Sequence, residues 1–342
     1  MKIGLIGYQG SGKSTLFEWL TGVAPDPALS HTTQSAMAPL ADKRVAALAE
    51  VYHPKKITLA SLQLIDTPGL SRTHEKSAAR LGMIREAGCL VVVVAAFDGS
   101  DPLADLVNFE EDLLLADLEI VTRRVERLRE SVKKPRPTRE QEMAELAALE
   151  PLLTALEAGR SPGEAELADE QLNMTRSFQL FSGKPRLIVV NVGDDEQDPK
   201  RFFRSTTGPV TALAVPLGLA VELERLSAAD RAEMIEDLGL VIYPRDRLLE
   251  AMLAASGQMC FFTASEKEVR TWLLRRGGTA LEAADGIHSD LARGFIRAET
   301  MCCDDLVRLG SERELKAQNL VRSEPKNYVV QEGDILHIRF SV

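Results

Sequence analysis

Short apolar runs, separated by amphipathic segments, recur through most of this chain. The runs that predict strands of one sheet cover residues 3–6, 58–65, 90–95, 186–191 and 210–215. Their apolar residues are consecutive rather than alternating, which is typical of strands buried on both faces of a sheet. Helices are predicted over residues 14–20 and 41–51, with a polar, irregular segment over 22–38. We therefore expect a doubly wound, mainly parallel α/β sheet whose ligand lies at the carboxyl ends of the strands.

A different pattern follows residue 101, where apolar residues recur at steps of three and four. Leu114, Leu118, Val121, Val125, Leu128 and Val132 form one such series. They define one face of a long helix, which Pro135 and Pro137 end. A second series runs from Met143 to Leu156 and stops at a glycine- and proline-containing turn over 159–163. This pattern predicts a helical hairpin inserted into the first domain.

The last 85 residues have a third pattern, of short strands around one helix. Strands are predicted at 261–263, 271–274, 328–330 and 335–342, and a helix over 280–292. This order indicates a small β-grasp module. The resulting domains are 1–100 plus 184–257 for the sheet domain, 101–183 for the helical arm, and 258–342 for the β-grasp module.

Composition limits the classes of protein that remain. The chain has 342 residues, 45% hydrophobic and 27% charged, which is typical of a soluble protein with two or three domains. The net charge of −10 argues against a general nucleic-acid coat. Cys89, Cys260, Cys302 and Cys303 form no C-x-x-C pair, and no signal or membrane-spanning segment is evident. We therefore expect a cytoplasmic protein with reduced thiols.

One segment departs from the acidic average. Between residues 121 and 139 there are two acidic residues and eight basic ones, namely Arg123, Arg124, Arg127, Arg129, Lys133, Lys134, Arg136 and Arg139. Two interpretations stay open: a solvated helix face, or a contact surface for an RNA backbone.

The chain begins with the strongest functional signal, Gly7-x-x-x-x-Gly12-Lys13-Ser14. This spacing is that of a phosphate-binding loop, and it stands between a predicted strand and a predicted helix. The backbone of Gly7, Gly10, Ser11, Gly12 and Thr15 would surround the phosphates at a helix N-terminus. Lys13 would reach the β- and γ-phosphates as the catalytic cation, and the Ser14 hydroxyl would bind Mg²⁺. The sequence therefore predicts a nucleotide-binding protein.

A second motif, Asp66-Thr-Pro-Gly69, ends the predicted strand 58–65. The Asp66 carboxylate would support the Mg²⁺ shell, and the Gly69 N–H would approach the γ-phosphate. Taken alone this tetrapeptide is a common turn. Its position some fifty residues after Lys13 favours the nucleotide-binding interpretation.

These residues and several others resemble the YchF family, the Obg-like ATPases among P-loop proteins related to translation factors. The resemblance covers nearly the whole chain. The motifs that carry it are Gly12-Lys-Ser-Thr-Leu-Phe17, Leu115-Ala-Asp-Leu-Glu119, Phe262-Thr-Ala264, Lys267-Glu-Val-Arg270, Ile287-His-Ser-Asp290, Gly294-Phe-Ile-Arg-Ala298 and Tyr328-Val-Val-Gln-Glu-Gly-Asp334. The resemblance implies a G-domain-like fold with a C-terminal TGS module. It also implies hydrolysis of ATP in preference to GTP by a cytoplasmic protein that engages ribosomes.

The segment expected to bind the base departs from the family. YchF-like proteins carry Asn-x-x-Glu there, whereas this chain has Asn191 followed by Asp194. A carboxylate at this place can accept hydrogen bonds from guanine, while the missing lysine removes stacking over the base. Leu217 and Gly218 would line the other side of the base. ATP is favoured from the resemblance, GTP stays open, and a solvent-facing turn at Asp194 is the structural alternative.

The hydrolytic segments depart as well. Leu70 stands where Ras-like proteins place a water-orienting glutamine, so slow turnover is expected. The family's asparagine in the phosphate loop is Gly10 here, and its first switch motif is reduced to Thr33-Gln-Ser-Ala. Thr33, or its neighbour Thr32, would close over Mg²⁺, and His74 is more simply an inert loop histidine. A binding module without hydrolysis is the main alternative, ahead of a metabolic phosphotransferase. The oligomeric state is not indicated.

Overall fold

The computed structural model describes residues 1–71, 77–97, 99–163, 168, 171, 174–194, 211–239 and 242–341. The chain divides into two compact units. The first comprises Met1–Ala36 and Gln63–Arg245, and the second comprises Met37–Leu62 and Asp246–Val342. The boundary falls within strands β2 (Gln34–Pro39) and β4 (Ser61–Asp66).

The sheet of the first unit has the strand order β2-β4-β1-β5-β6-β7 in the described part of the chain. Its other strands are β1 (Lys2–Ile6), β5 (Cys89–Ala96), β6 (Arg186–Val192) and β7 (Thr211–Val215). Strand β1 pairs in parallel with β4 and β5, and β6 pairs in parallel with β5 and β7. The predicted mainly parallel sheet is therefore confirmed. Because the strands run the same way, the phosphate loop after β1 and Asp66 at the end of β4 lie at one edge.

Helices complete the first unit. They are α1 (Lys13–Thr21), α3 (Ser77–Gly82), α4 (Pro102–Ser131), α5 (Arg139–Glu157), α7 (Leu217–Arg225) and α8 (Ala228–Leu238), with short 3₁₀ helices at Pro27–Leu29 and Arg176–Phe178. Helix α9 (Arg245–Ala255) begins at the boundary and belongs to the second unit. None of the helices in the described ranges is both long and apolar enough to cross a membrane. The core beneath the sheet combines β5 and β6 with Phe109 of α4 and Phe181.

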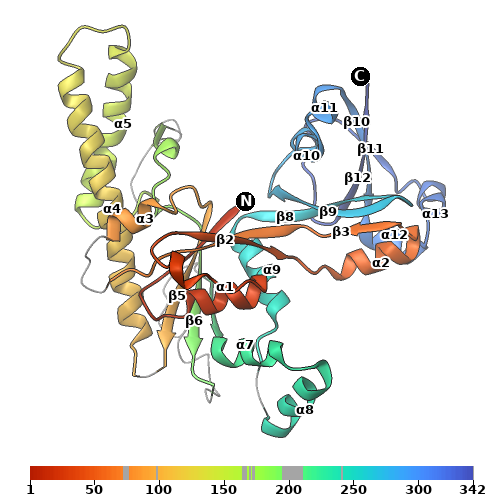
Figure 1. The fold of residues 1–342 in the computed structure, drawn as a ribbon. Coiled ribbons are helices and arrows are strands. Elements are labelled where there is room, and N and C mark those ends of the chain that lie inside the picture. Colours follow the sequence, from red (N-terminus) through yellow and green to blue (C-terminus); the bar gives the residue numbers. More distant parts are fainter. Residues whose placement is uncertain are drawn as a thin grey trace. The chain divides into compact units, whose positions relative to one another are not determined.

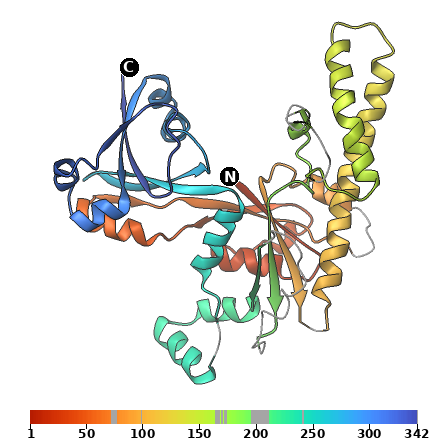
Figure 2. The ribbon, with the colours of Figure 1, turned by 180° about the vertical axis from the view of Figure 1, so that it is seen from behind.

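The predicted helical hairpin is present as α4 and α5, which pack along each other and extend away from the sheet (Figures 1 and 2). Asp101 begins α4 by accepting hydrogen bonds from the backbone N–H groups of Leu103 and Ala104, and Pro102 fits the first turn. The seam of the hairpin consists of Val121, Val125, Leu128, Leu149, Leu152, Leu153 and Leu156. These are the positions that the three- and four-residue periodicity placed on one face.

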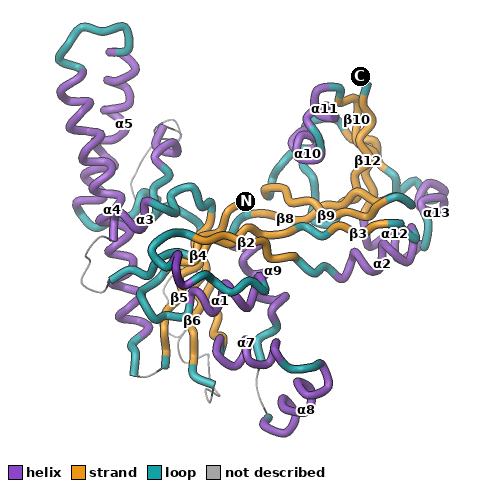
Figure 3. The backbone as a smooth tube through the Cα atoms, in the orientation of Figure 1, coloured by secondary structure: helices purple, strands orange, loops and turns teal. Residues whose placement is uncertain are grey.

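The second unit has its own six-stranded sheet among the described residues, in the order β11-β10-β12-β8-β9-β3 (Figure 3). Its elements are α2 (Lys43–Tyr52), β3 (Lys56–Thr58), β8 (Gln258–Ala264), β9 (Glu268–Arg275), α10 (Ala280–Ile287), α11 (Ser289–Arg293), β10 (Phe295–Cys302), α12 (Cys303–Leu309), α13 (Glu312–Ala317), β11 (Arg322–Glu324) and β12 (Asp334–Phe340). Val45 and Leu48 of α2 share a core with Phe262 and Ile335. The segment Met37–Leu62 is thus packed into this unit.

Four local predictions were wrong. The strand predicted over 58–65 begins only at Ser61, as β4, because Thr58 ends β3, which pairs in the other sheet. The helix predicted over 280–292 breaks at His288, whose backbone is extended. Its ring nitrogen Nδ1 accepts a hydrogen bond from the N–H of Asp290 and so begins the next helix, α11. Residues 328–330 form only an isolated bridge from Val329 to Thr279. The polar segment 22–38 contains a 3₁₀ turn and the start of β2, and strands β10 and β11 were not predicted.

Candidate functional site

The phosphate loop connects β1 to α1, and two of its glycines are required by their surroundings. Gly7 has φ +150°, and a Cβ built there would lie 2.2 Å from the carbonyl oxygen of Val93. Gly12 precedes α1 with φ +100°, and its Cβ would lie 2.4 Å from Nδ2 of Asn191. Gly10 has φ +83° but open space around it. The loop can therefore keep this backbone path against Val93 and Asn191 only with glycine at positions 7 and 12.

Lys13 lies inside this loop with 5% of its surface exposed. Its Nζ donates to the carbonyl oxygen of Tyr8 at 2.7 Å and to Oγ of Ser11 at 3.4 Å. Burial lowers the pKa of Lys13 to about 8, with Asp66 opposing this shift and Arg80 adding to it. The ammonium group is thus held where its charge is poorly solvated, and a phosphate would supply the missing counter-charge.

Asp66 is in the complementary situation. Its Oδ2 accepts a hydrogen bond from Oγ of Ser14 at 2.7 Å, while its buried Oδ1 has no hydrogen-bond partner. Burial raises the pKa of Asp66, although the hydrogen bond from Ser14 opposes the shift. A hydroxyl and a carboxylate with one unpaired buried oxygen are the oxygen donors that Mg²⁺ prefers. The residues present therefore fit the predicted metal.

These groups face a cavity of about 520 Å³. It is lined by Gln9, Gly10, Lys13, Ser14, Thr15, Glu18, Pro25, Asp26, Pro27, Ser30, His31, Thr32, Gln34, Asp66, Thr67, Pro68, Gly69 and Arg80. The structure thus brings together most of the residues predicted for phosphate and metal. Thr33 is exposed and does not line the cavity, whereas Thr32 does.

The turn that carries Gly69 is fixed against the phosphate loop. A Cβ built on Gly69 would lie 2.7 Å from Cα of Gln9, so the two backbones are in direct contact. Oγ1 of Thr67 donates to the carbonyl oxygen of Leu5 at 2.6 Å, which anchors the start of the turn to β1. Gly69 therefore lines the cavity next to Gln9 of the phosphate loop.

The four residues predicted for the base form a separate group. Both polar atoms of the Asn191 amide are engaged: Nδ2 donates to the carbonyl oxygen of Ser11, and Oδ1 accepts from the N–H of Leu217. Oδ1 of Asp194 accepts from the N–H of Leu219 at 3.3 Å, and lies 3.5 Å from a Cβ built on Gly218. Asn191 thus connects the phosphate loop to α7, and Asp194 lies at the N-terminus of that helix.

Several residues of the cavity had no sequence signal. Glu18, His31 and Arg80 reach it from loops and from helix faces that no motif marks, and Gln9 stands at a variable position inside the phosphate-loop motif. Arg80 follows Gly69 by eleven positions, and only the fold brings it back to the loop. His74 lies outside the described residues, as do Asp195 and Glu196.

Comparison with known proteins agrees with this geometry. Residues 2–135 match the family described as 50S ribosome-binding GTPase, and residues 259–341 match the family named YchF-GTPase_C, described as a protein of unknown function. A solved structure, that of the Schizosaccharomyces pombe YchF GTPase, has a TM-score of 0.81 and 24% identity, covering 99% of this chain and 97% of that one. The likeness confirms the fold class.

Curated relatives extend the similarity over the full length. The ribosome-binding ATPase YchF of Haemophilus influenzae is 31% identical, over 100% of this chain and 99% of its own. The Bacillus subtilis protein of the same name is 30% identical, over 99% of both chains. The Obg-like ATPase 1 of Oryza sativa is 32% identical, over 100% of this chain and 92% of its own. With the phosphate loop and both matched regions in place, the chain belongs to the YchF family.

Proposed function

We propose that this protein binds a nucleoside triphosphate with Mg²⁺ and hydrolyses it slowly, as a switch that engages the ribosome. The observation that carries the proposal is the pair of unsatisfied opposite charges in one cavity. Among the described residues, no carboxylate is hydrogen-bonded to the buried cation Lys13, and one oxygen of the buried anion Asp66 has no partner. A triphosphate with its metal ion satisfies both.

Each residue then has a role in the reaction. Backbone N–H groups of the loop and the N-terminus of α1 hold the phosphates, and Lys13 neutralises the β- and γ-phosphate oxygens. Ser14 and Asp66 would hold Mg²⁺, which supplies further positive charge to the phosphates. Gly69 would place its N–H at the γ-phosphate. Water attacks the γ-phosphorus in line with the departing diphosphate, and positioning accounts for most of the catalysis.

We favour ATP over GTP. The position of the usual base-stacking lysine is Val192, a strand residue with 4% exposure in the core. The Asp194 carboxylate already accepts a hydrogen bond from the N-terminus of α7. Both features weaken specific recognition of guanine, and the names of the relatives, which are called ATPases, support the preference for ATP. Leu217 and Gly218 are the residues we place against the base.

Calorimetric titration with Mg²⁺ and slowly hydrolysed analogues of ATP and GTP tests this proposal. Tighter binding of the ATP analogue is expected, and tighter binding of the GTP analogue would assign Asn191 and Asp194 to guanine. Turnover of the natural nucleotide should then be absent in Lys13→Ala. If the wild type binds but does not turn over, the protein is a nucleotide-dependent binding module.

The ribosomal part of the proposal rests on the helical arm. Several of its basic residues are already paired: Arg124 makes two hydrogen bonds to Glu145, Arg129 pairs with Glu150, and Lys133 pairs with Glu130. Three others, Arg127, Lys134 and Arg136, have no carboxylate within ion-pair distance among the described residues and lie together at one depression. They are the charges available to a phosphate backbone.

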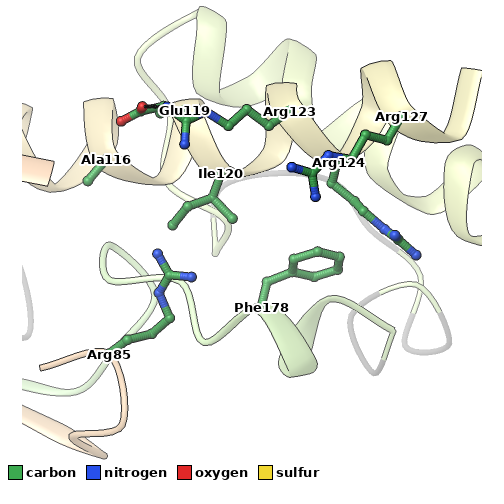
Figure 4. A pocket seen from close by; sticks show the side chains of 8 residues that line it. All are labelled: Arg85, Ala116, Glu119, Ile120, Arg123, Arg124, Arg127 and Phe178. Carbon is green, nitrogen blue, oxygen red and sulfur yellow. Dashed lines mark hydrogen bonds and ion pairs between the residues drawn. The ribbon is translucent and has the colours of Figure 1, made fainter. Parts of the chain in front are cut away.

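A second depression of about 530 Å³ continues this basic face toward the sheet (Figure 4). Arg123, Arg124 and Arg127 line it from α4, and Arg85 and Phe178 approach from the opposite side. Nε of Arg85 is buried without a hydrogen-bond partner. Phe178 is partly buried, and Arg123 and Arg124 are paired with Glu119 and Glu145. The guanidinium groups of Arg85 and Arg127 beside this ring suit a nucleotide unit, whose base stacks while its phosphate is neutralised.

Ribosome co-sedimentation tests this surface. Exchanging Arg127, Lys134 and Arg136 for glutamine should weaken binding and reduce the slope of log affinity against log salt by about 0.7–0.9 for each lost phosphate contact. Arg129→Gln is the matched control, because its charge is already compensated by Glu150. Equal binding by both variants would assign the basic residues to a solvated face.

The three domains proposed from the sequence, 1–100 with 184–257, 101–183 and 258–342, would serve as the nucleotide switch, the RNA-binding arm and the TGS module. Within these bounds, Met37–Leu62 and residues 246–257 pack in the same compact unit as 258–342. We place the protein in the cytoplasm, in keeping with ribosome-binding relatives.

A further inference from the structure

The residue at the usual water-orienting position takes no part in the cavity. Leu70 is 3% exposed and packs in the core with Ile6 and Tyr8. Its backbone is fixed as well, because its N–H donates to the carbonyl oxygen of Gly7 and its carbonyl accepts from the N–H of Gln9. Hydrolysis at this site therefore needs a polar or charged group from another position.

Arg80 supplies such a group. It lies in the last turn of α3, is half-buried, and lines the same cavity as Lys13, Ser14 and Asp66. A guanidinium N–H donates to the carbonyl oxygen of Gly69. Among the described residues no carboxylate lies within ion-pair distance of Arg80, although Asp66 lines the same cavity.

The hydrogen bond from Arg80 to Gly69 indicates which end of a bound triphosphate the guanidinium would contact. Gly69 is packed against Gln9 of the phosphate loop and follows Asp66, which is hydrogen-bonded to Ser14 and would hold Mg²⁺ in the proposed site. In the proposed site Gly69 faces the γ-phosphate, so the guanidinium beside it lies at the same end. Burial is the main cause of the lowered pKa of Lys13, Asp66 opposes the shift and Arg80 adds to it, so the charge of Arg80 is felt at Lys13.

We propose that Arg80 is a catalytic residue that this chain supplies to its own γ-phosphate. This inference rests on the proposed function. When a triphosphate binds, the guanidinium exchanges the neutral carbonyl of Gly69 for γ-phosphate oxygens, since a charge-assisted hydrogen bond is about twice as strong as a neutral one. Such an arginine provides in cis the charge that other phosphate-loop proteins take from a partner.

The balanced step is hydrolysis. The oxygen of water forms a bond to the γ-phosphorus, the bond from that phosphorus to the bridging oxygen breaks, and its electron pair leaves with the diphosphate. The water proton is released with the inorganic phosphate. Arg80 neutralises negative charge on the γ-phosphoryl oxygens and the bridging oxygen during the transfer, and takes no proton itself.

A purely positioning role is the alternative, in which Arg80 only holds the carbonyl of Gly69. Arg80→Gln separates the two, because a glutamine amide can donate to that carbonyl but carries no charge. Arg80→Lys keeps the charge without the planar fork. Arg313→Gln, at an exposed arginine of α13, is the control for the loss of one positive charge.

The experiment measures single-turnover hydrolysis of ATP and GTP with enzyme in excess, together with binding of the diphosphate plus aluminium fluoride. Arg80→Gln should lower the rate by roughly 10²–10³-fold and lose the aluminium fluoride complex, while binding of a slowly hydrolysed triphosphate changes less than about tenfold. Arg80→Lys should recover part of the rate, and Arg313→Gln should match the wild type.

A wild-type rate and a wild-type aluminium fluoride complex in Arg80→Gln would overturn the inference and leave Arg80 as a support for Gly69. A wild-type protein that turns over neither nucleotide would overturn the proposed hydrolysis and this inference together. The two failures are distinguished by the wild-type rate alone.

Discussion

Nucleotide binding should be coupled to proton uptake at Lys13. In the ligand-free site burial lowers the pKa of this ammonium to about 8. The phosphates of a bound triphosphate favour the charged form, so the group is protonated in the complex. Above pH 8 the free site holds a mostly neutral amine, and binding must therefore take up a proton. Affinity falls as the pH rises.

The magnitude follows from that single titration. With a free pKa of about 8, roughly 0.24 of a proton is taken up at pH 7.5 and roughly 0.9 at pH 9. The dissociation constant for the triphosphate should rise about eightfold between these two pH values. The phosphates of the ligand are fully ionised over this range, so they contribute little.

Calorimetry in buffers of different ionisation enthalpy measures the uptake directly, with a slowly hydrolysed analogue as the ligand. Lys13→Arg is the matched variant, because a guanidinium does not titrate in this range. Its uptake should be near zero at both pH values. Uptake near zero in the wild type at pH 9, or equal uptake in both proteins, would refute the assignment of this proton to Lys13.

Other predictions concern the loop, the metal and the arm. Gly7→Ala should abolish triphosphate binding in a titration, because its Cβ would overlap the backbone, whereas Gly10→Ala should cost only the roughly 1–2 kcal/mol of a left-handed residue. Asp66→Ala should weaken Mg²⁺ affinity by roughly 10–100-fold, and chelation of Mg²⁺ should then change nucleotide affinity less than in the wild type. In urea unfolding, Asp117→Ala should destabilise the first unit by about 3 kcal/mol, because two backbone N–H groups and a hydroxyl lose a buried acceptor, while its neighbour Glu119→Ala costs under about 0.5 kcal/mol. Wild-type triphosphate affinity in Gly7→Ala would contradict the argument on the loop. Wild-type dependence of nucleotide affinity on Mg²⁺ in Asp66→Ala would contradict the argument on the metal. Equal free energies of unfolding for Asp117→Ala and Glu119→Ala would contradict the argument on the arm.

The hydrophobic pattern of a segment predicted its secondary structure wherever the whole segment packs in one sheet or against one helix. The buried strands β1, β5 and β6 read as continuous apolar runs, and the α4–α5 hairpin read as a periodic stripe that two prolines end. The pattern did not predict the structure of a segment whose parts pair with strands of different sheets. Residues 58–65 look like one strand, but β3 pairs with β9 in the second unit while β4 pairs with β1 in the first.

The phosphate loop was determined by the sequence because its chemistry is local. Gly7, Gly12, Lys13 and Ser14 lie within eight residues, and the strand and helix around them follow from neighbouring side chains. Asp66 was readable as well, since its motif ends a strand at a characteristic distance. Mg²⁺ and nucleotide could therefore be predicted from a few residues.

The tertiary structure alone decided which other groups enter the cavity. Arg80 lines the cavity from a helix that carries no motif. Leu70 does not line it, because its side chain is buried in the hydrophobic core. The charge state of Lys13 is likewise a tertiary property, since burial by the whole loop sets its pKa. The same holds on the arm, where Glu145 and Glu150 of α5 pair with Arg124 and Arg129 of α4, while Arg127 has no ion pair among the described residues. Distances across the fold fix these roles, and no spacing along the chain encodes them.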